Sequence, residues 1–312
     1  MTHSPETSHP APSTDPGVVL ITGASSGIGA LTARELSAAG HIVYAGIRNS
    51  TGENAGVVRE FEQHAVANKV ELRSVELDVC SDDSVVAAVE KISVEAGGID
   101  VLVHNAGHMV LGPSEAFTPA QCMALYDTNV VGAQRLNRAA LPAMRERGSG
   151  LVVWVGSSST RGGCPPFLGP YFAAKAAGDA LAVSYAAELI RFGIDTTIVI
   201  PGAFTSGTNH FAHAGHPDDR TVAEAYDERY GQLMGEVDER LAGLLPPDAD
   251  VADVAREIRR IVELPAGQRP LRTTIDPSQD GSEIVTTVGD RIRVEFFRRV
   301  GLDDLLTPHS SR

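Results

Sequence analysis

The sequence predicts an α/β protein with one parallel β-sheet that is covered by helices on both faces. Short apolar runs alternate with longer segments of helical spacing from Gly17 onward, and this alternation is typical of parallel sheets. The apolar runs are nearly continuous, as in strands that are buried on both faces. The chain has 312 residues, 43% of them hydrophobic and 21% charged, a composition that suits a soluble globular protein with a sizeable core.

The expected elements follow one another in a regular order. Strands are expected at 18–23, 41–48, 70–79, 99–107, 151–159 and 194–202. Helices are expected between them at 28–40, 56–67, 81–95, 118–147 and 171–192. Gly40 can end the first helix, and the SDDS run that starts at Ser81 can begin the third, because acids are favoured at helix N-termini.

The pattern changes after Gly202. Residues 203–248 are polar and contain the Pro246-Pro247 break. We interpret them as a substrate-lid insertion, because long loops beside a fixed site often cover it. A helix at 250–263, a strand at 270–276 and a helix at 292–300 are expected next, the last within a C-terminal extension at 277–312.

The chain is interpreted as a single domain at 17–312 after a disordered tail. A separate second domain is the alternative, but the region after residue 202 has little apolar strand material. Residues 1–16 are rich in Pro, Ser and Thr, which predicts disorder. They have neither a basic start nor an apolar core, so they are not expected to be a signal peptide.

Composition also bears on partners and location. The formal net charge is −14, which argues against a nucleic-acid role because phosphate binding needs clustered Lys and Arg. No apolar run approaches the roughly 20 residues that cross a bilayer, so no membrane partner is expected. The three cysteines, Cys80, Cys122 and Cys164, show no metal-like pairing, which favours reduced thiols and a cytoplasmic location.

A glycine-rich turn, TGASSGIG, follows the first expected strand and opens the first expected helix. Its glycines are Gly23, Gly27 and Gly29, a spacing that differs from the general G-x-G-x-x-G fingerprint. Glycines let the backbone approach a pyrophosphate, and the helix N-terminus supplies N–H groups and a positive dipole. A turn without a ligand is the alternative, but the placement favours a nucleotide site.

The end of the second expected strand bears on the choice of cofactor. An NAD site carries an acid about 20 residues after the glycines, where it binds the ribose hydroxyls. Ile47 fills that position and Arg48 follows it. An arginine can receive the 2′-phosphate of NADP, so the sequence favours NADP(H). NAD(H) is the alternative cofactor, and a solvated surface side chain is the alternative role for Arg48.

Seven motifs in order resemble the short-chain dehydrogenase/reductase family over about residues 17–275. They are TGASSGIG at 22–29, LDV at 77–79, HNAG at 104–107, NVVG at 129–132, SSS at 157–159, Tyr171-x-x-x-Lys175 and PGAFTSGT at 201–208. The resemblance implies a Rossmann-like doubly wound sheet, and a homodimer or homotetramer. It also implies the compact branch that acts on simple carbonyls and alcohols, since the branch that remodels nucleotide sugars has another glycine spacing.

The resemblance also implies which residues bind the cofactor. Asp78 and Val79 would hold the adenine, and Pro201, Gly202 and Thr205 would contact the nicotinamide side. His104 stands where the family usually has Asn. The expected cofactor-binding set is Gly23, Ser25, Ser26, Gly27, Ile28, Gly29, Arg48, Asp78, Val79, Asn105, Ala106, Gly107, Tyr171, Lys175, Pro201, Gly202 and Thr205.

Four residues form the expected catalytic set: Asn129, Ser158, Tyr171 and Lys175. Tyr171 and Lys175 are four apart in an expected helix, so they share one face. A nearby ammonium lowers a tyrosine's pKa from its ordinary value of about 10, which suits a general acid/base. The resemblance implies that Asn129 holds a water that relays protons to Lys175.

Ser158 lies thirteen residues before Tyr171, the spacing that the family most often shows. Its hydroxyl is expected to hydrogen-bond the substrate oxygen and to stabilise developing negative charge. Ser157 and Ser159 are the alternatives. Alternation of side chains along a strand disfavours both of them if the strand extends that far.

Two further patterns allow a functional and a plainer structural interpretation. The histidines of NHFAHAGH, His210, His213 and His216, could suggest a metal, but Gly215 and Pro217 argue against a regular helix and no metal is expected. Cys164 could face the substrate or be a small buried residue.

The predicted function is hydride transfer between NADP(H) and a mainly apolar secondary alcohol or ketone, with Tyr171 as general acid/base. The apolar loop at 165–168 supports an apolar substrate. The alternative is a redox-sensing module that binds NADP(H) without turnover. Such modules usually lose the Tyr or the Lys, and both are present here.

Overall fold

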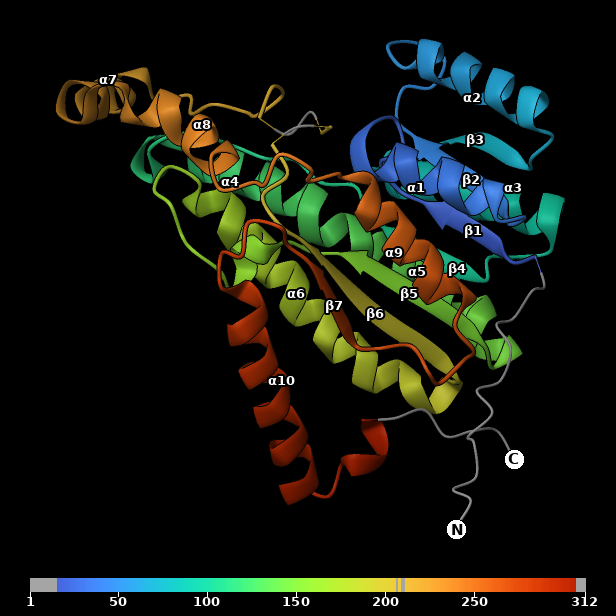
Figure 1. The fold of residues 1–312 in the computed structure, drawn as a ribbon. Helices are drawn as coiled ribbons and strands as arrows, with labels where there is room; N and C mark the ends of the chain where they lie inside the picture. Colours follow the sequence, from blue (N-terminus) through green and yellow to red (C-terminus); the bar gives the residue numbers. More distant parts are fainter. Residues whose placement is uncertain (1–15, 206, 209–210, 307–312) are drawn as a thin grey trace.

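The fold is built on one parallel sheet, seen in a computed structural model that describes residues 16–205, 207–208 and 211–306. Seven strands lie in the order β3-β2-β1-β4-β5-β6-β7 (Figure 1). They are β1 Val18–Ile21, β2 Ile42–Ile47, β3 Leu72–Glu76, β4 Val101–His104, β5 Gly150–Val155, β6 Ile194–Pro201 and β7 Arg272–Ile275. All neighbouring strands are parallel, so the predicted Rossmann-like doubly wound sheet is confirmed.

Helices cover both faces of this sheet. They are α1 Gly27–Ala38, α2 Ala55–Asn68, α3 Asp82–Ala96, α4 Pro119–Tyr126, α5 Gly132–Arg147, α6 Gly169–Leu189, α7 Arg220–Tyr230, α8 Val237–Ala242, α9 Ala252–Glu263 and α10 Ser282–Arg299. Apolar side chains of α3, α5 and α6 form one core with the strands. Those of α1, α2 and α9 form a second core on the opposite face. None of the helices in the described ranges is long and apolar enough to cross a membrane.

The strand order places one crevice at the centre of the sheet. The chain runs outward from β1 to β3 and then returns to add β4 on the other side of β1. In open α/β sheets ligands bind at this switch point, outside the carboxyl ends of the strands. The loops after β1 and β4 therefore carry the expected ligand-binding residues.

Three elements differ from the sequence expectation. The helix expected at 118–147 is α4, a π-helical turn at Asp127–Val131 and then α5. The strand expected at 151–159 ends at Val155, and a 3₁₀ turn follows at Ser158–Thr160. The last helix, α10, begins at Ser282 rather than at residue 292.

The segment expected as a lid forms α7, a 3₁₀ turn and α8. Its apolar side chains pack with Phe167 and Leu168 from the loop between β5 and α6. Val237 of α8 belongs to this small cluster, and Tyr171 of α6 borders it. The segment therefore lies against the loop that precedes the tyrosine.

Candidate active site

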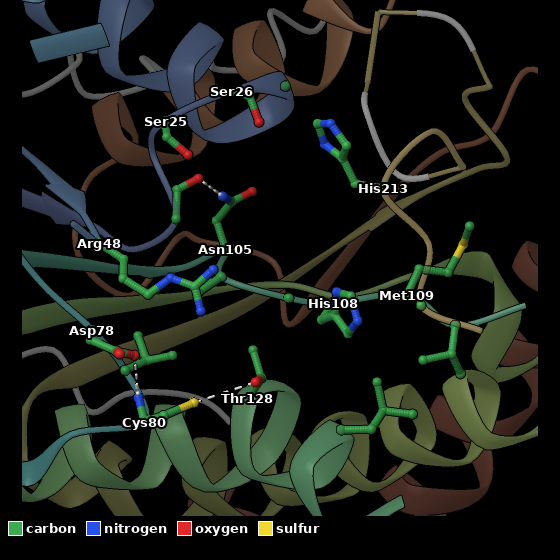
Figure 2. Close-up of a pocket in the computed structure, with 18 of the residues that line it drawn as sticks. Ser25, Ser26, Arg48, Asp78, Cys80, Asn105, His108, Met109, Thr128 and His213 are labelled. Atoms are coloured by element: carbon green, nitrogen blue, oxygen red, sulfur yellow. Dashed lines mark hydrogen bonds between the residues drawn. The ribbon is translucent and has the colours of Figure 1, made fainter. Parts of the chain in front are cut away.

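A cleft of about 500 Å³ opens at the switch point of the sheet (Figure 2). It contains most of the residues that the sequence assigned to the cofactor. Its lining includes Gly23, Ser25, Ser26, Gly27, Ile28, Arg48, Asp78, Val79, Asn105, Ala106 and Gly107. A cavity of this size matches the general range of cofactor pockets, about 300–1,000 Å³.

The glycine turn needs glycine at two positions for reasons of backbone geometry. Gly23 and Gly27 have φ of 64° and 53°, values that other residues adopt only with strain. A Cβ on Gly23 would also lie 2.7 Å from the Cα of Ala106. The turn therefore brings the backbone of α1 close to the cleft, as a pyrophosphate site requires.

Hydrogen bonds tie this turn to the end of β4. The Asn105 side-chain amide donates to the carbonyls of Thr22 and Gly23, at 2.9 and 3.0 Å. The Thr22 hydroxyl accepts from the backbone N–H groups of Asn105 and Ala106, at 3.0 and 2.9 Å. The two loops that border the cleft are thus held as one unit before any ligand binds.

Arg48 enters the cleft from the end of β2, and its side chain points across the cavity in Figure 2. Ile47, at the position where an NAD site carries an acid, is fully buried. Glu76 is the acid at the adjacent end of β3, but its carboxylate accepts from the backbone N–H groups of Asn49 and Ser50, at 2.8 and 2.7 Å. This end of the cleft therefore presents a guanidinium, which suits a phosphate.

The opposite wall of the cleft is the loop after β3. Asp78 accepts a hydrogen bond from the backbone N–H of Cys80 through Oδ1, at 2.9 Å, and this contact shapes the loop. Val79 is 8% exposed and lies beside Cys80 in the lining. Together these residues give this wall both a carboxylate and an apolar side chain, at the place where the sequence predicts the adenine.

A smaller cavity of about 60 Å³ continues the cleft toward the tyrosine. It shares Ile28, Asn105, Gly107 and Thr208 with the larger one. Its other lining residues are Asn129, Val155, Gly156, Ser157, Tyr171, Lys175, Pro201, Gly202 and Phe204. The glycine turn and the tyrosine–lysine pair thus border two adjacent cavities that share part of their lining.

Burial dominates the acid–base properties of the two residues on α6. It raises the pKa of Tyr171 to about 12, while the hydrogen bond with the Ser157 hydroxyl acts in the opposite direction. Burial lowers the pKa of Lys175 to about 8, and the nearby Asp179 acts against this. The expectation that Lys175 lowers the pKa of Tyr171 is not met in this state, because its Nζ donates to the carbonyl of Val155, at 3.0 Å.

Asn129 lies in the π-helical turn between α4 and α5. Its side-chain amide donates to the carbonyls of Leu125 and His108, at 2.9 and 3.0 Å, and its Oδ1 accepts from the His108 N–H, at 3.3 Å. Turns of this type interrupt helices and are frequent at functional sites. Here the turn places Asn129 beside Lys175, on the lining of a shared cavity.

The serine prediction requires a correction. Ser157 lines the tyrosine cavity and contacts Tyr171, whereas Ser158 is 4% exposed and does not belong to that lining. The argument from strand alternation fails because β5 ends at Val155, before the serines. The 3₁₀ turn then directs Ser157 toward the cavity, and Ser157 replaces Ser158 as the candidate.

The segment after β6 contributes differently from the expectation. Pro201 and Gly202 line the tyrosine cavity, as the sequence predicted. Thr208 lines both cavities, whereas Thr205 is absent from the described lining of either one. The PGAFTSGT motif predicted which segment borders the cavities, but it did not predict which of the segment's threonines lines them.

The histidine-rich segment contacts the cleft only in part. His213 and His216 line the larger cavity, together with His108 from the loop after β4. His210 lies outside the described residues. Within the described ranges no group of three metal-ligating side chains occurs. Cys164 is exposed, and its thiol donates to the Gly162 carbonyl at 3.5 Å.

Comparison with known proteins gives consistent matches. The family model for short chain dehydrogenases matches residues 17–216. A 3-ketodihydrosphingosine reductase from Bacteroides thetaiotaomicron is 36% identical over 192 residues, 62% of this chain and 65% of the relative. The matched stretch thus spans slightly less than two thirds of that relative.

Two solved structures extend the comparison. A short-chain dehydrogenase from Streptomyces avermitilis has a TM-score of 0.68 and 29% identity, covering 92% of this chain and 98% of the other. A gluconate 5-dehydrogenase from Burkholderia cenocepacia, in complex with NADP and tartrate, has a TM-score of 0.65 and 25% identity. That match covers 84% of this chain and 94% of the other.

Proposed function

Because the chain belongs to the short-chain dehydrogenase/reductase family, we propose that it transfers a hydride between NADP(H) and a secondary alcohol or ketone. The observation that carries the proposal is a pair of adjacent cavities with shared lining, one at the glycine turn and the other at Tyr171 and Lys175. The glycine turn, the α1 N-terminus and Arg48 would hold the cofactor. The bound cofactor would supply or receive the hydride.

The protein's own residues have separate roles in this proposal. The Tyr171 hydroxyl donates its proton to the substrate oxygen during reduction and takes it back during oxidation. The Ser157 hydroxyl hydrogen-bonds the same oxygen as negative charge develops. Lys175 binds the nicotinamide ribose, and Asn129 holds a water that returns protons to the lysine.

The surroundings of Tyr171 favour a substrate with an apolar part. Met109, Phe167 and Leu168 form a buried cluster that Tyr171 borders. The Bacteroides relative is named a 3-ketodihydrosphingosine reductase, so its name refers to a keto substrate. We propose a ketone or secondary alcohol whose apolar body lies against this cluster, beneath the helices of the 203–248 insertion.

The central test is substitution of Tyr171 by Phe. The variant is expected to keep NADPH binding, measured by cofactor fluorescence, and to lose most turnover on a panel of apolar ketones, measured by NADPH absorbance. Undiminished turnover would refute the mechanism. If the wild-type protein binds NADPH but turns over no member of the panel, the redox-sensing alternative is supported.

The serine assignment is tested by a matched pair of variants. Ser157→Ala is expected to lower kcat about 100-fold, the scale of losing one oxyanion-hole donor. Ser158→Ala is expected to leave kcat within a few-fold, because that hydroxyl does not face the cavity. If Ser158→Ala lowers kcat more than Ser157→Ala does, Ser158 is the catalytic serine instead.

The cofactor preference has its own measurement. If Arg48 contacts the 2′-phosphate, Arg48→Ala should weaken NADPH binding about 10- to 100-fold, the range of a charge-assisted hydrogen bond, and leave NADH binding nearly unchanged. Equal losses for the two cofactors would contradict the assignment.

The oligomeric state, a homodimer or homotetramer, stays a prediction that analytical ultracentrifugation can check.

A further inference from the structure

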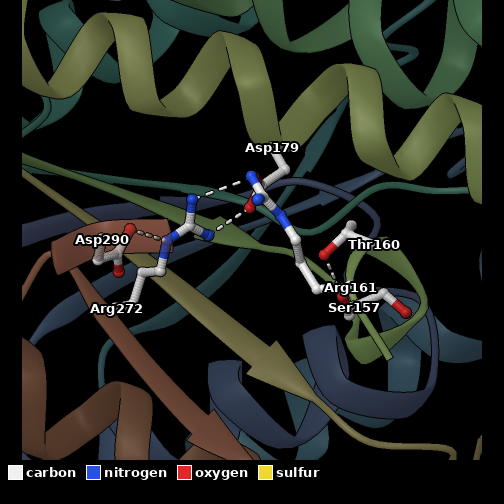
Figure 3. Close-up of polar contacts among 6 residues, drawn as sticks. All are labelled: Ser157, Thr160, Arg161, Asp179, Arg272 and Asp290. Atoms are coloured by element: carbon white, nitrogen blue, oxygen red, sulfur yellow. Dashed lines mark hydrogen bonds and ion pairs between the residues drawn. The ribbon is translucent and has the colours of Figure 1, made fainter. Parts of the chain in front are cut away.

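An ion-pair cluster with a buried centre lies one turn of α6 beyond the candidate catalytic lysine, and the proposed mechanism does not use it; Figure 3 shows its side chains. We call it the Asp179 cluster; its members are Arg161, Asp179, Arg272 and Asp290. The Asp179 and Arg272 side chains are 3% and 6% exposed. Arg272 donates to both carboxylate oxygens of Asp179, with Nη2 to Oδ2 at 3.0 Å. Its Nε donates to Asp290 Oδ1 at 3.1 Å.

The cluster touches both elements that carry the proposed chemistry. Asp179 follows Lys175 by one turn of α6, so the two side chains share a face. Both line a cavity of about 30 Å³. Arg161 Nη2 donates to Asp179 Oδ2 at 3.4 Å. Arg161 follows the 3₁₀ turn that Ser157 begins, in which the Thr160 hydroxyl donates to the Ser157 carbonyl at 3.0 Å.

The titratable and charged groups near Lys175 come from five elements. On α6 they are Asp179 and the protonated, neutral Tyr171. From β4, His104 lines the same cavity, and burial lowers its pKa to about 4, so it is neutral at pH 7. Arg161 contributes from the loop after β5, Arg272 from β7, and Asp290 and Arg293 from α10.

An ion pair whose partners are both buried leaves little net charge. A change in one partner exposes the full charge of the other. The ammonium of Lys175 is therefore sensitive to whether Asp179 and Arg272 are both present.

We propose that Asp179 and Arg272 are positioning residues for Lys175, which hold its turn of α6 in place and keep the charge behind it balanced. Asp290 anchors Arg272 from α10. Arg272 and Asp290 both lie beyond the 17–216 stretch that matches the family model. The C-terminal segment would thus complete the surroundings of the catalytic lysine. The proposal rests on the proposed function only for the role of Lys175.

The proposal predicts shifts of opposite sign. Asp179→Asn leaves the cluster with one positive charge in excess, because Asp290 alone remains opposite Arg161 and Arg272; this disfavours the ammonium and lowers the titration midpoint of Lys175. Arg272→Met leaves the Asp179 carboxylate in excess, which favours the ammonium and raises the midpoint. Each shift should be about one pH unit, for a charge one helical turn away in a partly screened interior. The double variant should return the midpoint close to the wild-type value.

The chain makes this titration directly measurable. It has three lysines, Lys69, Lys91 and Lys175, so a protein labelled with ¹³Cε-lysine gives three assignable NMR signals. Lys69 and Lys91 are exposed and serve as internal references. The measurement uses the protein without cofactor or substrate. It therefore tests the cluster independently of whether the proposed reaction occurs.

A second buried pair provides the matched control. Arg269 Nη1 and Asp195 Oδ2 are 2.9 Å apart, with side chains 12% and 5% exposed, and Asp195 lies at the opposite end of β6 from the site. Asp195→Asn should leave the Lys175 midpoint unchanged. An equal shift in this control would overturn the proposal, as would shifts of the same sign in Asp179→Asn and Arg272→Met, or no shift in either.

Two milder variants keep the test decisive if a single substitution prevents folding. Asp290→Asn changes a carboxylate that is 32% exposed and should lower the midpoint by a smaller amount. In active protein, the pH profile of kcat should move in the same direction as the midpoint. An unchanged midpoint in Asp290→Asn together with a displaced midpoint in the double variant would refute the charge balance.

Discussion

The buried ammonium of Lys175 should reduce the stability of the protein, and Lys175→Met should recover that stability at neutral pH. Burial lowers the pKa of Lys175 from 10.5 to about 8. The unfolded chain therefore binds more protons than the folded chain between these values, and stability rises with pH across the window. The penalty is complete below pH 8 and disappears above the ordinary pKa of lysine.

The magnitude follows from the width of that window. Each pH unit between the two pKa values corresponds to about 1.4 kcal/mol, so the penalty at pH 7 is about 3 kcal/mol. It should fall to about 1 kcal/mol near pH 10. The variant also loses the hydrogen bond to the Val155 carbonyl, which is worth about 1 kcal/mol. The expected net gain at pH 7 is about 2 kcal/mol.

The assay is urea unfolding between pH 7 and 10, followed by the fluorescence of Trp154. This is the chain's single tryptophan; it is 5% exposed and lies 4.5 Å from the His104 ring, measured between ring centroids. Lys91→Met, at an exposed site, is the control and should show no pH-dependent difference. A difference between Lys175→Met and wild type that stays constant from pH 7 to 10 would refute the reasoning.

Three further results are expected. Gly23→Ala should destabilise the fold by about 1–3 kcal/mol, because φ is 64° there and a side chain is strained in that region; NADPH titration should show weaker binding. The pKa of His104 is lowered to about 4 by burial, against the hydrogen bond with Asn137. Stability should therefore fall as pH drops from 6.5 to 4, by up to about 3 kcal/mol, and His104→Asn should remove that part of the slope in urea unfolding. Arg269→Met should cost about 3 kcal/mol, because it leaves the buried Asp195 carboxylate without its charged partner and with only the hydrogen bond from the Gly267 N–H; a variant that also carries Asp195→Asn should recover most of this in thermal unfolding.

The sheet could be predicted from the sequence because each strand carries its own local pattern. The continuous apolar runs are long enough to be recognised singly, and the helices between them fix a parallel arrangement. The observed strand ends differ from the expected ones by a few residues where polar side chains follow an apolar run. At Val155 this matters, because the strand's end decides which serine faces the cavity.

The last helix was underestimated for a different reason. Apolar residues recur every four positions in α10, at Ile284, Val288, Ile292 and Phe296, but each of them is more than half exposed. The buried side chains of this helix are the polar Ser282 and Thr286. An apolar periodicity normally marks the helix face that packs on the core. In α10 the apolar face is exposed, so the periodicity did not predict the residue at which the helix begins.

The Asp179 cluster could not be predicted, since its central contact joins residues 93 positions apart. Its cause is the topology of the sheet edge. β7 pairs with β6 in a register that places Arg272 beside Ile198, and Ile198 lines the small cavity behind Lys175. Alternate side chains of a strand added at this edge face α6, and Arg272 is one of them, whereas its neighbour Thr273 contacts Glu257 of α9 on the other face. Asp179, one turn of α6 after Lys175, is the buried partner of Arg272 in this strand. The surroundings of Lys175 therefore depend on β7, a segment that the family motifs do not include.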